Sequence, residues 1–422
     1  MLVVRASTVT GSVPAPASKS YTHRALALAL LTERSRIVEP LLSEDPLATL
    51  ACVRALGGKA TEDAEGVTIE GGALITPDTI LDCMNSGTTM RLFTAIAALA
   101  PGASVLTGDA SLRKRPMQPL LDALKPLGVE AWSTRGNGLP PVIVKGPLRG
   151  GRTSLPGDVS SQYVSALLIA GTQAREDLDL TLTSPLKSRP YVEITLEMLR
   201  HFGARVATRE TGFHVPAGQR LRGLTYRVPG DYSSAAFPLC AAAVTGGEVT
   251  VTNLDPRTAQ GDKFILECLR RFGAAVKEHE DGSVTVKGGA LQGITVDLSD
   301  TPDMFPALCA VASHARGESV FTGAKHLRFK ESDRIAAMVT ELRKMGVDAT
   351  EREDGAVLRG GPVTGARVHS YHDHRIEMAL AVCGLAAKGE TVVDDHESHA
   401  VSYPRFIEHF QGLGGHLEVR AT

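Results

Sequence analysis

The sequence predicts an α/β protein of two domains, each built from three repeats of one β-hairpin and two helices. Three features indicate this fold: the chain length, a recurring helix–glycine phrase, and an alternating hairpin after most of these glycines. At 422 residues the chain exceeds what one hydrophobic core usually serves, so two domains are expected. Three copies in each half is the simplest division.

The repeat is marked by an amphipathic helix that ends at a glycine. Glycine tolerates the left-handed conformation that follows a helix C-terminus. Helix–glycine–strand phrases are common in any α/β protein, but recurrence in register along the whole length favours a true repeat. The glycines in question are Gly57, Gly128, Gly203, Gly273, Gly346 and Gly414.

Each repeat continues through the hairpin and a further strand into a second helix. These second helices are strongly apolar, and each opens with a short polar phrase. They are expected to begin near Ser18, Asn85, Val159, Asp231, Asp300 and His372.

The sixth repeat is incomplete: after residue 415 the sequence has room for only one strand, so the second strand of its hairpin is missing. The start of the chain, residues 1–16, alternates like a strand and resembles the missing piece. We therefore expect the two termini to meet in the C-terminal half. The predicted domains are residues 18–227, and residues 1–17 with 228–422, with the active site in the cleft between them.

The composition is typical of a soluble globular protein, with 43% hydrophobic and 22% charged residues. The net charge of −2 argues against a sequence-independent nucleic-acid binder. The chain shows neither a signal peptide nor an apolar run of about 20 residues, which favours a cytoplasmic location without membrane contact. The six cysteines form no CxxC pair and are expected to be buried free thiols.

Polar residues concentrate where the second helices begin. A helix N-terminus offers unpaired N–H groups and the positive end of the helix dipole, so it suits anions. The first start combines Ser18, Lys19 and Ser20 with His23 and Arg24. These groups could hold a phosphate or carboxylate, or they could be a plain serine cap with solvated charges.

Two more helix starts lie in the predicted N-terminal domain. Asn85–Arg91 contains Gly87, which lets a ligand approach the backbone closely, although the phrase could also be an ordinary cap. Ser160, Ser161 and Gln162 open an apolar helix. Because a cap needs only one polar residue, the other two indicate a ligand.

The predicted C-terminal domain adds carboxylates. Asp303 could cap a helix or serve chemistry. Lys330 and Arg334 share a helical face, where Glu331 could simply pair with Arg334 or could transfer a proton beside a bound anion. The histidines of the phrase 372–375 suggest a metal, but spacing fixes no third ligand, so no metal is predicted.

Seven motifs in order show that the chain closely resembles the 3-phosphoshikimate 1-carboxyvinyltransferase (EPSP synthase) family of enolpyruvyl transferases. The family fold has two domains of three repeated units, with helices inside and sheets outside, which agrees with the repeat count. The helix-inside packing is implied by the resemblance alone. The motifs are PASKSYTHRAL at 16–26, NSGTTMR at 85–91, RP at 115–116, VSSQ at 159–162, SRPY at 188–191, LRFKESDR at 327–334 and DHR at 373–375.

The resemblance implies transfer of the enolpyruvyl group of phosphoenolpyruvate to the 5-hydroxyl of shikimate 3-phosphate, with release of phosphate and no cofactor. The implied catalytic residues are Asp303 as proton acceptor, Glu331 as proton donor and Lys19, which touches both substrates. The implied shikimate 3-phosphate ligands are Lys19, Ser20, Arg24, Ser160, Ser161, Gln162, Ser188, Tyr191, Asp303 and Lys330. The implied phosphoenolpyruvate ligands are Lys19, Gly87, Arg115, Gln162, Arg334 and Arg375.

Two positions depart from the pattern of some members: Val401 stands where they carry a lysine, and His326 where they carry an asparagine.

A sister family uses UDP-N-acetylglucosamine as acceptor, but it has Asn where this chain has Ser20, and it commonly carries a cysteine in the loop that reads GDASLRKRPM here. A non-catalytic polyanion or RNA-binding repeat protein is a further alternative. The expected partners are the two small molecules, and the chain is expected to be a monomer.

Overall fold

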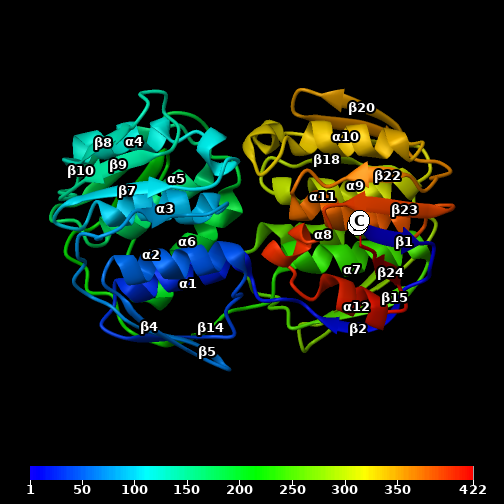
Figure 1. Cartoon of the computed structure of the whole chain (residues 1–422), viewed down its shortest axis with the longest axis horizontal. Helices are drawn as coiled ribbons and strands as arrows, with labels where there is room; N and C mark the ends of the chain where they lie inside the picture. The colour runs from blue at the N-terminus through cyan, green and yellow to red at the C-terminus, as the bar shows by residue number, and fades with distance from the viewer. Residues whose placement is uncertain (422) are drawn as a thin grey trace. The chain divides into compact units, whose positions relative to one another are not determined.

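The computed structural model describes residues 1–421 and divides into two compact units (Figure 1). The N-terminal half is Ala17–Val228, and the C-terminal half combines Met1–Pro16 with Pro229–Thr422. Among the described residues, no helix has both the length and the apolar character needed to span a membrane.

The N-terminal half contains three four-stranded sheets with strand orders β14-β3-β5-β4, β6-β7-β9-β8 and β10-β11-β13-β12. Its helices are α1 Lys19–Leu30, α2 Glu44–Ala55, α3 Gly87–Ala97, α4 Gln118–Leu124, α5 Ser161–Gly171 and α6 Arg189–His201, with 3-10 turns η1 Leu112–Lys114 and η2 Lys125–Leu127. Its strands are β3 Ser35–Val38, β4 Lys59–Asp63, β5 Gly66–Glu70, β6 Leu81–Asp82, β7 Ala103–Thr107, β8 Glu130–Ser133, β9 Val142–Lys145, β10 Gly151–Leu155, β11 Leu178–Leu182, β12 Ala207–Arg209, β13 Gly212–Val215 and β14 Thr225–Arg227.

The C-terminal half repeats this design with strand orders β16-β17-β15-β2, β18-β19-β21-β20 and β22-β23-β1-β24. Its helices are α7 Tyr232–Thr245, α8 Ile265–Phe272, α9 Phe305–His314, α10 Arg334–Lys344, α11 His374–Gly384 and α12 Phe406–Gly412, with 3-10 turns η3 Gly261–Phe264, η4 Pro302–Met304, η5 Lys325–Phe329 and η6 Ser398–Val401. Its strands are β1 Leu2–Arg5, β2 Thr10–Pro14, β15 Glu248–Thr252, β16 Ala275–Glu278, β17 Val284–Lys287, β18 Thr295–Asp297, β19 Glu318–Thr322, β20 Asp348–Arg352, β21 Gly355–Arg359, β22 Arg367–His369, β23 Glu390–Asp394 and β24 His416–Val419.

The six predicted helix-ending glycines all adopt the left-handed conformation. Their φ angles run from 83° at Gly203 to 104° at Gly273. In this region a side chain with a Cβ is strained, which explains why glycine recurs at these helix ends. The repeat prediction is confirmed, and the structure contains three four-stranded sheets in each half.

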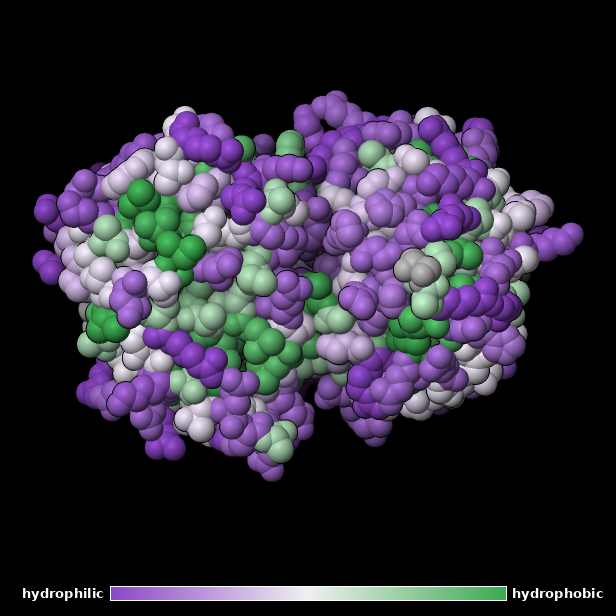
Figure 2. Space-filling model, in the orientation of Figure 1, coloured by the Kyte–Doolittle hydropathy of each residue, from purple (hydrophilic) through white to green (hydrophobic). Residues whose placement is uncertain are grey.

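Helices lie inside and sheets outside in each half. The helices that follow the polar phrases, such as α7 and α9, are apolar on all sides and almost wholly buried. In the C-terminal half α7, α9 and α11 pack against one another. The visible surface is mostly hydrophilic (Figure 2), and the predicted inside-out α/β fold is confirmed.

The chain start completes the sixth repeat. Strand β1 pairs antiparallel with both β23 and β24, so Leu2 lies opposite Val393 and Val419. The prediction of one N-terminal strand is wrong, however. Residues 1–16 form two strands, and β2 pairs parallel with β15 in a different sheet.

Candidate active site

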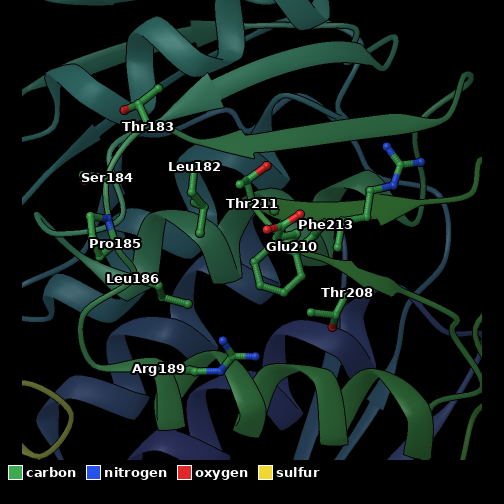
Figure 3. A pocket seen from close by; sticks show the side chains of 12 residues that line it. Leu182, Thr183, Ser184, Pro185, Leu186, Arg189, Thr208, Glu210, Thr211 and Phe213 are labelled. Atoms are coloured by element: carbon green, nitrogen blue, oxygen red, sulfur yellow. The ribbon is translucent and has the colours of Figure 1, made fainter.

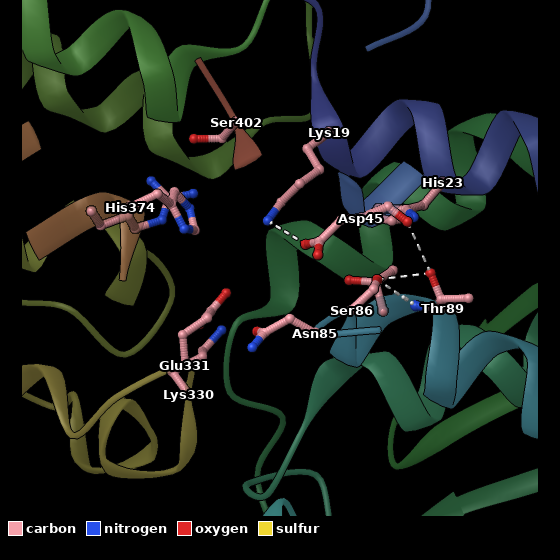
Figure 4. Close-up of polar contacts among 12 residues, drawn as sticks. Lys19, His23, Asp45, Asn85, Ser86, Thr89, Lys330, Glu331, His374 and Ser402 are labelled. Atoms are coloured by element: carbon pink, nitrogen blue, oxygen red, sulfur yellow. Dashed lines mark hydrogen bonds and ion pairs between the residues drawn. The ribbon is translucent and has the colours of Figure 1, made fainter. Parts of the chain in front are cut away.

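The start of α1 presents Lys19, whose Nζ lies 2.9 Å from Oδ2 of Asp45 in the first turn of α2 (Figure 4). Both side chains are largely buried, so water screens this ion pair less than one on the surface. Ser18 has the extended backbone of an N-cap, but its side chain makes no capping hydrogen bond. The alternative of a plain serine cap with solvated charges is therefore wrong.

Arg24 is buried among the helices of the N-terminal half. Its Nε donates to Thr195 Oγ1 at 2.7 Å, and its Nη2 donates to the Tyr191 carbonyl at 3.0 Å and Ser165 Oγ at 3.3 Å. Its Nη1 donates to the Ser20 carbonyl at 2.9 Å. Burial lowers the pKa of Arg24 to about 10, so the guanidinium stays charged at neutral pH. Arg24 thus ties together the backbones of Ser20 and Tyr191, two other residues of the expected site.

The starts of α3 and α5 are joined by side chains. Gln162 Nε2 donates to Thr88 Oγ1 at 3.0 Å, and Gln162 Oε1 accepts from Arg91 Nη1 at 2.6 Å. Ser160 caps α5 by accepting from the Gln162 amide N–H at 3.3 Å. These bonds place the expected ligands Ser160, Ser161 and Gln162 beside the helix that begins at Gly87.

Two guanidinium groups converge on Gly87. A Cβ added there would lie 2.6 Å from Arg91 Nη1 and 3.1 Å from Arg115 Nη1. Arg115 is held by Asn85 Oδ1, which accepts from its Nη2 at 2.6 Å. Two cations beside a helix N-terminus form a favourable environment for an anion.

Ser188 and Tyr191 lie at the start of α6. Ser188 has φ 53° and ψ 39°, a left-handed conformation that costs free energy in a residue with a Cβ. Such strain is found most often at functional sites. The Tyr191 carbonyl accepts from Arg24, which links this start to α1.

In the C-terminal half, Arg334 is surrounded by three carboxylates. Its Nη1 donates to Asp303 at 2.9 Å, its Nη2 to Glu331 at 2.9 Å, and its Nε to Asp373 at 2.8 Å. Burial alone would lower the pKa of Arg334, but the charges of Asp373, Glu331 and Asp303 outweigh it and raise the pKa. The guanidinium therefore fixes the two carboxylates expected to transfer protons.

Two more cations surround Asp303. Its Oδ1 lies 3.4 Å from Lys330 Nζ, and its Oδ2 lies 3.5 Å from Arg375 Nη2. The C-terminal half thus gathers all of its expected residues, namely Asp303, Lys330, Glu331, Arg334 and Arg375. His326 lies on η5 and Val401 at the end of η6.

The phrase 372–375 serves helix capping and ion pairing. Asp373 caps α11 by accepting from the Arg375 amide N–H at 3.0 Å, and it also binds Arg334. Within residues 1–421 no three His, Cys, Asp or Glu side chains are grouped so that they could hold a metal ion. All six cysteines are free and buried.

A separate surface pocket lies between α6 and the hairpin β12–β13 (Figure 3). Leu182 and Phe213 form its apolar part, and Arg189 and Arg209 are among its lining residues. Arg189 pairs with Glu193 at 3.1 Å, and Arg209 pairs with Asp179 at 2.7 Å. The pocket contains none of the residues expected from the sequence.

Four charged residues of these clusters were not predicted from the sequence as site residues: Arg91, Asp45, Asp373 and Asp262. The sequence did contain a signal for Arg91: it lies four residues after Gly87, and this spacing places both residues on the same face of a helix. Asp45 and Asp373 could not be singled out, because an acidic residue at a helix start is usually a cap or a dipole partner.

Asp262 is a buried carboxyl on η3 that accepts a hydrogen bond from the Ser233 hydroxyl. Burial and then the charge of Asp303 raise its pKa to about 6, although Arg375 and the Ser233 bond act against them. Asp262 therefore belongs to the same charge cluster as Asp303.

This pKa predicts a pH-dependent stability. Because the folded-state pKa lies above the ordinary aspartate value of 3.8, the contribution of Asp262 to stability is most favourable below about pH 4 and is lost as the pH rises through about 6. Asp262→Asn removes the ionisation, so the variant should gain about 2–3 kcal/mol relative to wild type between pH 4 and pH 8. Urea unfolding of both proteins at the two pH values measures the difference, and a pH-independent difference would contradict the prediction.

The chain matches the family model described as EPSP synthase (3-phosphoshikimate 1-carboxyvinyltransferase) over residues 3–410. A 3-phosphoshikimate 1-carboxyvinyltransferase of Methanocella arvoryzae is 50% identical over 416 residues, covering 98% of each chain. One of Halobacterium salinarum is 47% identical over 422 residues, covering 97% of this chain and 98% of the other. A solved EPSP synthase from Acinetobacter baumannii is similar with TM-score 0.84 and 34% identity, covering 100% of this chain and 99% of that one.

Proposed function

Because the chain belongs to the EPSP synthase family, we propose that the polar helix starts of both halves bind the two substrates of that enzyme. The reaction transfers the enolpyruvyl group of phosphoenolpyruvate to the 5-hydroxyl of shikimate 3-phosphate and releases phosphate. It belongs to the shikimate pathway, which leads to chorismate and the aromatic amino acids. The relatives found favour this acceptor over UDP-N-acetylglucosamine, and favour catalysis over polyanion binding.

We assign binding of shikimate 3-phosphate mainly to the N-terminal half. Ser160 and Ser161 bring hydroxyls and amide N–H groups to the α5 start, and Arg24 holds Ser20 and Tyr191 nearby. The remaining ligands in this assignment are Lys19, Gln162, Ser188, Asp303 and Lys330. Hydroxyl and N–H donors with a few cations are the groups that a phosphate monoester requires.

We assign phosphoenolpyruvate to the cations around Gly87 and those of the C-terminal half. Arg115 approaches Gly87, and the other ligands in this assignment are Lys19, Gln162, Arg334 and Arg375. Positive charge near the transferring group offsets the charges of two anionic substrates.

The observation that carries the mechanism is that one buried guanidinium, Arg334, holds both Asp303 and Glu331. In the addition step the 5-hydroxyl loses its proton to Asp303 while its oxygen bonds to C2 of phosphoenolpyruvate. The methylene carbon C3 gains a proton from Glu331, which gives a tetrahedral intermediate. In the elimination step Glu331 takes a proton back from C3, the C2–C3 double bond re-forms and the C2–O bond to phosphate breaks. The phosphate leaves with the proton that Asp303 had accepted, so no hydride, electron or acyl carrier is needed.

The substrate assignment predicts two separable effects. Ser161→Ala should raise the KM for shikimate 3-phosphate about 10-fold through loss of a charge-assisted hydrogen bond. Gly87→Ala should raise the KM for phosphoenolpyruvate by a similar factor, because its Cβ would displace Arg91 and Arg115. Each variant should leave the other KM nearly unchanged in a phosphate-release assay.

Matched controls are available in the chain. Ser154→Ala changes an exposed serine of β10, and Gly412→Ala adds a Cβ that meets no atom within 4 Å. Both should retain wild-type KM values. Unchanged KM values in Ser161→Ala and Gly87→Ala would refute the assignment.

The enzyme is further proposed to act as a cytoplasmic monomer on small molecules alone. The cytoplasmic location is supported by the six free cysteines, because disulfides are rare in the reducing cytosol.

A further inference from the structure

Asp45 is a carboxylate placed among the cations of the proposed anion site. Its Oδ2 lies 2.9 Å from Lys19 Nζ, and the two side chains are only 8% and 14% exposed. A buried negative charge repels anionic substrates, so it must provide a compensating benefit. The helix dipole does not require it, because the neighbouring Glu44 already offers an exposed carboxylate to the first turn of α2.

Helix α2, which carries Asp45, is fixed to α1 and α3 by a buried chain of polar groups. His23 Nδ1 lies 2.7 Å from Thr49 Oγ1, which lies 2.7 Å from Thr89 Oγ1. The Thr89 hydroxyl lies 2.7 Å from Ser86 Oγ, and Ser86 also caps α3 (Figure 4). Burial, followed by the charges of Lys19 and Arg24, lowers the pKa of His23, so the His23 side chain and the hydroxyl groups bonded to it are neutral at physiological pH. The start of helix α2, which carries Asp45, is therefore held in a fixed position.

We propose that Asp45 is a positioning residue of the enolpyruvyl transfer, which holds the Lys19 ammonium where it meets both substrates. The inference rests on the proposed function, which assigns Lys19 to both ligands. Lysine carries its charge on a flexible four-carbon stem, so an ion pair to a rigid partner fixes a group that would otherwise sample several rotamers. In this proposal Asp45 acts through Lys19 and does not touch substrate.

Asp45→Asn is expected to lower kcat about 10- to 100-fold, because a displaced catalytic group costs rate. The KM values for both substrates should stay unchanged or fall, because a negative charge leaves the site. Asp45→Glu should recover part of the lost kcat, whereas Glu44→Gln, the same charge change one residue earlier, should match wild type. A folded Asp45→Asn enzyme with wild-type kcat would overturn the inference.

A double-mutant cycle with Lys19→Gln tests whether Asp45 acts through Lys19. In the Lys19→Gln background, Asp45→Asn should change the residual rate of phosphate release less than 2-fold. The same loss in both backgrounds would show that Asp45 acts independently and would overturn the proposal. If Lys19→Gln itself keeps wild-type turnover and wild-type affinity for shikimate 3-phosphate by calorimetry, the assignment of Lys19 under the proposed function fails instead.

Discussion

Replacing Glu331 by Gln, or Asp303 by Asn, is expected to lower kcat by about 10²- to 10⁴-fold, the usual contribution of a positioned acid or base. Glutamine and asparagine keep the shape of the side chain and can still accept a hydrogen bond from Arg334, but neither can exchange a proton as the carboxyl does. The KM values should change far less than kcat, because the lost contribution belongs to the transition state. Steady-state phosphate release with both substrates varied measures the two parameters.

Folding must be intact for this result to count. Circular dichroism and the urea midpoint of both variants should stay close to wild type, and Glu280→Gln, which changes an exposed carboxylate, should keep full activity. A well-folded Glu331→Gln or Asp303→Asn enzyme with wild-type kcat would remove that residue from the mechanism.

Arg334→Met is expected to destabilise the protein by about 3–5 kcal/mol, the cost of removing one partner from a buried ion-pair cluster. Arg334 is 1% exposed, and Asp373 is fully buried. Without the guanidinium, Asp303, Glu331 and Asp373 would be left close together with their charges unbalanced. Methionine retains most of the side-chain volume, so the loss reports on charge and hydrogen bonding more than on a cavity. Urea unfolding at pH 7 measures it.

A control for this change exists on the same helix. Arg343→Met alters an exposed arginine of α10 and should cost less than about 1 kcal/mol. An equally small loss for Arg334→Met would mean that the three carboxylates are stabilised by other groups, and the central role given to Arg334 would have to be abandoned.

The fold could be predicted because its signals are local. A glycine at a helix end reports the left-handed conformation of that one residue, and six such positions in register reveal the repeat. The split of residues 1–16 into two strands could not be predicted from that segment. The two strands differ in their partners. Strand β1 pairs with β23 and β24, whereas β2 pairs with β15, and all three partners lie more than 200 residues further along the chain.

The candidate site was less predictable, because its carboxylates have two roles. Asp373 caps its own helix, which the sequence suggests, but it also binds Arg334, which lies 39 residues away in the chain. The sequence left open whether Glu331 pairs with Arg334, and that pair exists at 2.9 Å. The cations of the C-terminal half were expected mainly to attract anions, yet Arg334 is already surrounded by negative side chains. Only three-dimensional proximity reveals this balance of charge.

The pairing of β1 with β24 has a consequence for synthesis of the protein. Leu2 lies opposite Val419, so the first strand to leave the ribosome reaches one of its neighbours only after more than 400 further residues have been made. The segment Ala17–Val228 is continuous and can condense while translation proceeds. The other unit must wait for the last strand, and until then β1 exposes an unpaired edge that chaperones would need to shield from aggregation.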